Sequence, residues 1–137
     1  MNAALNITGA TVKYTGMTVC DSFPEDNGEP AFVIKALSGK KLVVLKFDVT
    51  NTTDSDIAVD IASKNLSFKG VFSQAIKTSA LVTLLPEALN TFDGKIKAGA
   101  TTQMVLVYEM SDGYVNNLST ITVEVKSESG TKSIKIK

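Results

Sequence analysis

Alternation of apolar and polar residues runs through most of this chain and predicts β-strands. Between residues 39 and 51 every second position from 43 to 49 is apolar, whereas positions 46, 48 and 50 are polar, so one strand face would pack into a core and the other would meet water. The same period returns over residues 102–110. The predicted core faces carry Val43, Leu45, Phe47 and Val49 in the first strand, and Met104, Leu106, Tyr108 and Met110 in the second.

Shorter runs of β-branched and aromatic residues, separated by turn formers, predict further strands. They cover residues 11–19, 31–37, 57–62, 66–72, 74–79, 81–85, 120–126 and 132–137. Gly16 interrupts the first run and indicates a β-bulge or a bend, and the last two runs are spaced as a hairpin. Pro86–Phe92 would form a single helical turn. Strands that recur about every ten residues, with hardly any helix, are typical of two packed antiparallel sheets.

One segment, Ala80–Leu85, is apolar on both faces, unlike its neighbours. Either it is a central strand buried on both sides, or one of its faces stays exposed for a partner. Burial is the interpretation that we favour. Pairing of Leu81–Leu85, or of the terminal residues Ile134–Ile136, with a neighbouring molecule would instead make the protein a subunit of a fibre or assembly.

Composition indicates a globular protein and argues against several functions. The 137 residues suffice for one domain, and 44% of them are apolar while 20% are charged. All fourteen basic residues are lysines, balanced by fourteen acidic ones, which speaks against nucleic-acid binding because that task relies on arginine and a basic face. No histidine is present to activate a serine, a threonine or the lone Cys20, so we expect no enzyme. Cys20 itself should be a half-buried side chain at a strand end.

Nothing in the hydropathy pattern predicts a membrane span, because the longest uninterrupted apolar stretch is only a few residues. The first residues also lack the charged start and the apolar core of an export signal. We therefore expect either a cytosolic protein or a chain from which an export signal has been removed.

Three aspartates in and after the turn at residues 51–56 suggest a metal site. Asp54, Asp56 and Asp60 alternate in a way that offers hard oxygen ligands, and calcium is the one cofactor that the sequence suggests. The spacing is not that of an EF-hand loop, which needs a central glycine and a final glutamate. The alternative is a solvated turn that leads into a strand with Asp60 on its outer face.

The acidic loop between residues 21 and 29 is the candidate for partner binding. Asp21, Glu25, Asp26 and Glu29 place four carboxylates within nine residues, next to Phe23 and Pro24. Loops at the end of a sandwich often carry recognition, so this one could bind calcium or a basic partner. The alternative is a flexible hairpin loop that its charge keeps in solution.

Paired carboxylates elsewhere could act as an acid and a base. Asp48 and Glu109 would do so if they faced each other across neighbouring strands, and the alternative is that both simply face solvent. Tyr14, Tyr108 and Tyr114 suit core or edge packing with the hydroxyl reaching water.

Three stretches together resemble a known group of domains. Residues 39–54, GKKLVVLKFDVTNTTD, resemble the long strand and turn of the immunoglobulin-like domains of unknown function found on lipoproteins and secreted proteins of Gram-positive bacteria. Leu89–Asn90 with Gly94–Gly99 resembles the loop that precedes their next long strand, and Val105–Met110 resembles that strand. Most of the chain is covered, although the segment Phe68–Leu85 departs from the pattern in its spacing.

The resemblance implies an all-β, immunoglobulin-like antiparallel sandwich of about seven to nine strands, with residues 1–137 as one domain. It also implies an extracellular protein, anchored or released, without catalytic residues. We therefore expect a secreted or cell-surface module that binds an unknown protein or glycan or acts as a spacer. The alternative is a calcium- or small-ligand-binding protein of the cell envelope.

Overall fold

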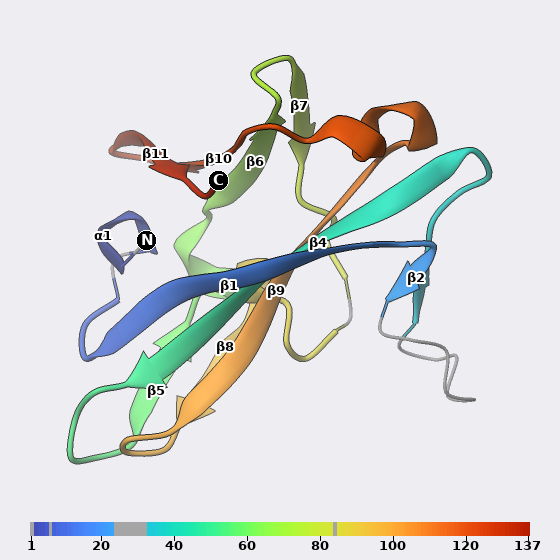
Figure 1. The fold of residues 1–137 in the computed structure, drawn as a ribbon. Helices are drawn as coiled ribbons and strands as arrows, with labels where there is room; N and C mark the ends of the chain where they lie inside the picture. Colours follow the sequence, from blue (N-terminus) through green and yellow to red (C-terminus); the bar gives the residue numbers. More distant parts are fainter. Residues whose placement is uncertain (1, 6, 24–32, 84) are drawn as a thin grey trace.

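The chain folds into a sandwich of antiparallel sheets (Figure 1), given by a computed structural model that describes residues 2–5, 7–23, 33–83 and 85–137. The strands are β1 Ala10–Cys20, β2 Ser22–Phe23, β3 Ile34–Lys35, β4 Lys40–Asn51, β5 Ile57–Asp60, β6 Ser67–Phe72, β7 Ile76–Ser79, β8 Asp93–Ile96, β9 Thr101–Ser111, β10 Ile121–Ser127 and β11 Gly130–Lys135. A short helix α1, Asn2–Leu5, and the 3₁₀ turns η2 Ala62–Lys64, η3 Leu89–Thr91 and η4 Asp112–Asn117 complete the described elements.

Two sheets form the layers of the sandwich (Figure 1). In the first sheet β4 lies between β1 and β9, and in the second the order is β11-β10-β6-β7. In chain order, β1, β4 and β9 take the places of strands A, B and E of an immunoglobulin-like sandwich, while β6, β10 and β11 take those of C, F and G. The expected fold class is therefore confirmed. The described ranges hold eleven strands, rather than about seven to nine, because the ribbons β2–β3 and β5–β8 add short ones.

The apolar faces of the two sheets meet in one core. The predicted inner faces of β4 and β9 are buried there against β6 and β10. Tyr108 of β9 packs edge-on against Phe72 of β6, with ring centroids 5.3 Å apart, and donates its hydroxyl hydrogen to the carbonyl oxygen of Phe68 at 3.4 Å. The expectation that this hydroxyl reaches water was wrong: Tyr108 is fully buried, and burial raises its pKa.

A second apolar cluster covers the outer face of the first sheet, where the alternation predicted contact with water. Residues 42–45 of β4 are all buried, and Leu42 and Val44 belong to this outer cluster together with Val105 and Val107 of β9. The prediction of a polar outer face holds only for the rest of the strand, where Lys46, Asp48 and Thr50 are partly exposed. The cover over the cluster consists of Cys20, Phe23, Ile34, Ala36, Leu81, Leu85 and Ala88.

The expected strand over residues 81–85 does not form in the described part of that segment. The chain crosses here from the second sheet to the first: Ala80 donates its N–H to Phe68 at 2.9 Å, and Leu81 donates its N–H to Val107 at 2.8 Å. Single bonds to two different sheets do not make a strand. Because Leu81 takes one of the edge carbonyls of β9, the crossing segment shields that edge from pairing with other chains.

The described side chains of this crossing segment differ in burial. Leu85 is buried against the outer cluster, whereas Val82 is 84% exposed. The preferred interpretation of the apolar stretch, burial on both faces, therefore applies to part of it only.

Most other strand predictions are confirmed with shifted ends. The run 11–19 is β1, and its register shifts between Tyr14 and Gly16, as the bulge predicted. Within the run 31–37 only β3 is a strand, and residues 31–32 lie outside the described ranges. Cys20 ends β1 and is half-buried, as expected. The helical turn predicted at Pro86–Phe92 is the shorter η3. None of the helices in the described ranges has the length and apolar character needed to cross a bilayer.

Candidate functional site

The base of the acidic loop is fixed to the sandwich through Asp21. Its Oδ1 accepts a hydrogen bond from the Lys41 ammonium group, which raises the pKa of Lys41, and its carbonyl oxygen accepts the N–H of Ala36 at 2.8 Å. Next to these contacts, β2 and β3 pair with each other and so hold the two ends of the loop together. Asp21 is thus paired within the molecule, and the other three predicted contact residues, Glu25, Asp26 and Glu29, lie outside the described residues.

The three aspartates proposed as metal ligands do not come together. Asp54 is exposed in the β4–β5 turn, Asp56 accepts the N–H of Ala98 at 3.1 Å, and Asp60 ends β5. Four residues of extended chain place Asp56 and Asp60 roughly 13 Å apart, too far to share one ion. In the described part of the chain, which includes all three, no trio of acidic, cysteine or histidine side chains could hold a metal ion. Calcium binding by the turn alone stays a prediction.

Asp60 instead stabilises the turn that follows it. Its two carboxylate oxygens accept the N–H of Ser63 at 3.0 Å and the Ser63 hydroxyl at 2.6 Å. These two hydrogen bonds lower the pKa of Asp60 below its ordinary value. The 3₁₀ turn η2 then ends at Asn65, which has a left-handed backbone with φ of 53°.

Asp48 and Glu109 do not form the acid–base pair considered from the sequence. Asp48 pairs with Gln103, whereas Glu109 pairs with Leu42 and accepts the N–H of Leu37 at 3.1 Å. Six residues of β4 separate Leu42 from Asp48, which puts the two carboxylates roughly 20 Å apart.

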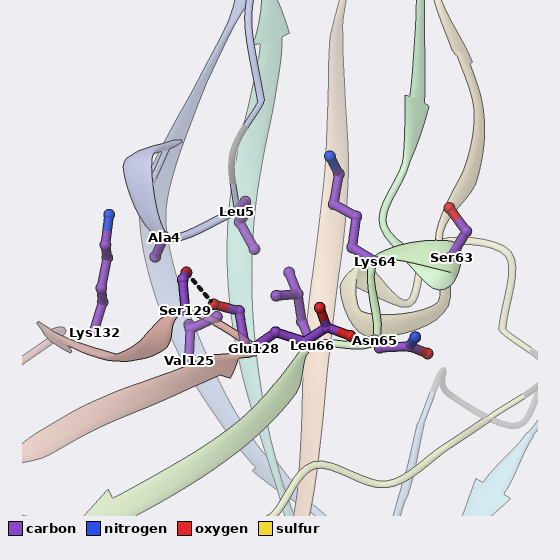
Figure 2. A pocket seen from close by; sticks show the side chains of 11 residues that line it. Ala4, Leu5, Ser63, Lys64, Asn65, Leu66, Val125, Glu128, Ser129 and Lys132 are labelled. Atoms are coloured by element: carbon purple, nitrogen blue, oxygen red, sulfur yellow. Dashed lines mark hydrogen bonds between the residues drawn. The ribbon is translucent and has the colours of Figure 1, made fainter.

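An open cleft of about 610 Å³ lies between η2 and the β10–β11 turn (Figure 2). One wall is the loop from Ser63 to Leu66, and the other is the turn from Ser127 to Ser129 with Lys132 of β11. The remaining lining residues are Ala4 and Leu5 of α1 and Val125 of β10.

The cleft combines hydroxyl, amide and charged groups. Lys64 and Lys132 stand at opposite sides of it, with Glu128 and Ser129 between them (Figure 2). The turn is fixed by a 2.9 Å hydrogen bond between the hydroxyls of Ser127 and Ser129. With both walls fixed by hydrogen bonds, the cleft presents donors and acceptors of both charges to a polar ligand.

Sequence reasoning did not find this cleft, because its two walls are more than sixty residues apart along the chain. They become neighbours through the pairing of β6 with β10, in which Ser67 lies opposite Lys126. The loop before β6 and the turn after β10 therefore meet at the same end of the sheet. The only signals in the sequence were the turn residues at 127–130 and the asparagine at position 65.

A family described as a domain of unknown function (DUF5067) matches residues 2–127. The chain belongs to this family. The matched region runs from α1 to the end of β10 and so includes the η2 wall of the cleft. No match was found among curated proteins.

Solved structures share the fold at low sequence identity. An uncharacterised β-sandwich protein from Clostridium difficile 630 is 15% identical, with a TM-score of 0.58 over 96% of this chain and 87% of that protein. A conserved hypothetical protein from Bacillus anthracis is 13% identical, with a TM-score of 0.55 over 96% of this chain and 89% of that protein. These likenesses establish the β-sandwich fold, and the resemblance to domains of unknown function is confirmed.

Proposed function

We propose that this member of the DUF5067 family is a non-enzymatic binding module that is secreted or held at the cell surface. The cleft between η2 and the β10–β11 turn carries the proposal. Its walls come from distant parts of the chain and are joined only by the pairing of β6 and β10. Loops that a rigid sandwich positions in this way are the usual places of recognition in such folds.

The lining of the cleft suits a polar partner. Its volume of about 610 Å³ lies within the range of ~300–1,000 Å³ that is typical of ligand sites. Serine hydroxyls, the Asn65 amide and charges of both signs match the donors and acceptors of a protein segment or a glycan. Because Asp60 fixes η2 through two hydrogen bonds, binding requires little ordering of that wall.

An extracellular location of the protein is supported by the resemblance of residues 39–54 to domains on exported bacterial proteins. We therefore expect the partner among proteins or glycans of the cell surface, and no nucleic acid. A role as a spacer between other parts of a surface protein is the alternative.

Capture from a cell-wall and detergent extract tests the proposal. The immobilised protein is compared with the cleft variants Lys132→Glu and Asn65→Gly, each checked for folding by circular dichroism; glycine removes the amide and accepts the left-handed backbone of this position. The matched control is Lys95→Glu, a charge reversal at an exposed position of β8 away from the cleft. A variant in which Glu25, Asp26 and Glu29 of the acidic loop are changed to Gln, Asn and Gln tests the second candidate surface, since Asp21 is already paired with Lys41.

The proposal predicts a protein or glycan that the native chain and Lys95→Glu capture and that both cleft variants lose. Capture that only this loop variant loses would move the site to the acidic loop. Capture that no variant changes, or no capture in repeated trials, would contradict binding at the cleft and favour the spacer.

A further inference from the structure

A smaller groove of about 250 Å³ opens where the chain leaves β7, and Leu66 lines both this groove and the cleft. We call it the Leu66–Val82 groove. Its lining consists of Leu66, Ser67, Phe68, Ser79, Ala80, Val82, Asn90 and Thr91.

The groove marks the point where pairing between β6 and β7 stops. In this pair Gly70 lies opposite Thr78 and Lys69 opposite Ser79. The 2.9 Å bond from the Ala80 N–H to the Phe68 carbonyl continues the same register by one more residue. In that register the next hydrogen-bonded pair would be Leu66 with Val82.

That pair does not form, because the chain turns toward the other sheet directly after Ala80. Leu81 donates its N–H to Val107 of β9, and its carbonyl oxygen accepts the side-chain amide of Asn90 at 3.0 Å. Both contacts hold the segment after Ala80 away from β6. The gap that results is the groove.

Two backbone positions therefore remain open at the groove. Within the described ranges, neither Leu66 nor Val82 has a backbone hydrogen bond to another residue. Because alternate residues of an extended chain aim their N–H and C=O groups to the same side, continuing the β6–β7 register by two residues would place these groups of Leu66 and Val82 on the side that Phe68 and Ala80 use. Such open positions are what an added strand pairs with.

The side chains around this open register are apolar. Phe68 is buried, Leu66 and Ala80 are half-buried, and Val82 at the lip is 84% exposed. Val82 is the most exposed of the large hydrophobic residues in the described part of the chain. An apolar side chain placed here would cover it and remove apolar surface from water.

We propose that the Leu66–Val82 groove binds a short extended peptide by β-strand addition, with one apolar side chain of the peptide against Leu66 and Val82. The open backbone groups select an extended peptide, and the apolar lining selects its side chain. Eight residues line the groove, whereas each side of a stable protein–protein interface uses about 20–30, so a second copy of this chain is not the occupant. The inference rests on the proposed binding function and gives the class of partner.

Amide NMR of the labelled protein tests this with a blocked five-residue peptide of alternating threonine and valine. We expect saturable shifts at the Leu66 and Val82 amides and slower hydrogen exchange there, because both would gain partners. The control is the same peptide with N-methylated amides, which cannot donate to the groove. Its affinity should be at least about tenfold lower.

Two protein variants distinguish peptide binding at the groove from nonspecific binding elsewhere on the protein. Val82→Asp should weaken peptide binding at least about tenfold and should leave the fold intact because Val82 is exposed. Leu37→Asp changes another exposed large hydrophobic residue, 66% exposed and outside the groove, and should bind the peptide as the native chain does.

Shifts centred elsewhere, equal binding of the N-methylated peptide, or no binding up to about 1 mM would overturn the proposal. A dimer in sedimentation that Val82→Asp abolishes, without peptide binding, would also overturn it in favour of a second copy. Capture that both cleft variants lose and that Val82→Asp keeps would leave the proposed function standing without the groove, so the two failures are distinguishable.

Discussion

Tyr108 and Phe68 join the two sheets across the core, because the Tyr108 hydroxyl donates to the Phe68 carbonyl oxygen at 3.4 Å. The same oxygen accepts the N–H of Ala80 at 2.9 Å, where the chain crosses between the sheets. The Phe68 carbonyl group thus links β6 to β9 and to the segment that leaves β7. Its hydrogen bond with Ala80 also marks the end of the Leu66–Val82 groove.

Tyr108→Phe should lower the free energy of unfolding by about 1 kcal/mol, the net worth of one buried hydrogen bond. The loss stays modest because the Phe68 oxygen keeps its bond from Ala80. Urea unfolding measures it. Tyr114→Phe, at a tyrosine that is 58% exposed, should leave the free energy unchanged. Equal stability of native protein and Tyr108→Phe would show that the bond contributes nothing.

Gly70→Ala should destabilise the protein by about 1–3 kcal/mol, because its new methyl group overpacks the core. A Cβ atom at this position would lie 2.5 Å from Cε2 of Phe72 and 3.0 Å from Cε1 of Tyr108. Gly113→Ala is the matched control, since nothing lies within 4 Å of a Cβ atom there. Thermal unfolding compares the two variants, and similar melting temperatures would contradict the packing described.

The long strands could be predicted from the sequence because alternation is a local property. Each residue of β4 and β9 that was assigned to the core from its spacing is buried in it. The outer cluster could not be predicted in this way. Leu42 and Val44 are covered by residues from β2, β3 and the crossing segment, and only the tertiary fold brings these together.

The candidate site was harder to predict for the same reason. Asp54, Asp56 and Asp60 are close in sequence, yet an extended strand separates the last from the others. Lys64 and Lys132 are distant in sequence, yet strand pairing brings them to one cleft. Closeness along the chain does not measure closeness in space where strands are extended.

Asn51→Asp should destabilise the protein by about 2–4 kcal/mol at neutral pH. Asn51 is fully buried, and its amide donates to the carbonyl oxygens of Ser55 at 2.8 Å and Ile96 at 2.9 Å. A carboxylate would face these two oxygens without a hydrogen to donate. Asn116→Asp, at an exposed position of η4, should change stability little. A small effect at position 51 in urea unfolding would contradict the role assigned to this amide.

Asp60→Asn should make the stability of the protein depend less on pH in the acidic range. Hydrogen bonds from Ser63 lower the pKa of Asp60 in the folded state, so its contribution is present above the unfolded-state pKa and is lost as pH falls through the folded-state value. The stability difference between the native chain and Asp60→Asn should therefore shrink below about pH 4. Melting temperatures from pH 7 to pH 2 test this, with Asp54→Asn, at an exposed position of the β4–β5 turn, as the control. A difference that stays constant with pH would contradict it.

Calcium should not raise the melting temperature through binding at the β4–β5 turn. Asp60 is bonded to Ser63, and Asp56 accepts the N–H of Ala98, so the β4–β5 turn offers too few carboxylates to one ion. Thermal unfolding in calcium is compared with unfolding in a chelator. An increase that Asp54→Asn and Asp56→Asn both abolish would establish the calcium hypothesis instead.

Hydrogen exchange on the complex with the captured partner is the decisive test of binding at the cleft, because it locates the bound surface without mutation. The account predicts that protection increases at residues 63–66 and at the β10–β11 turn, the two walls of the cleft. Protection confined to the ribbon β2–β3, or spread evenly over both sheets, would contradict a binding site at the cleft.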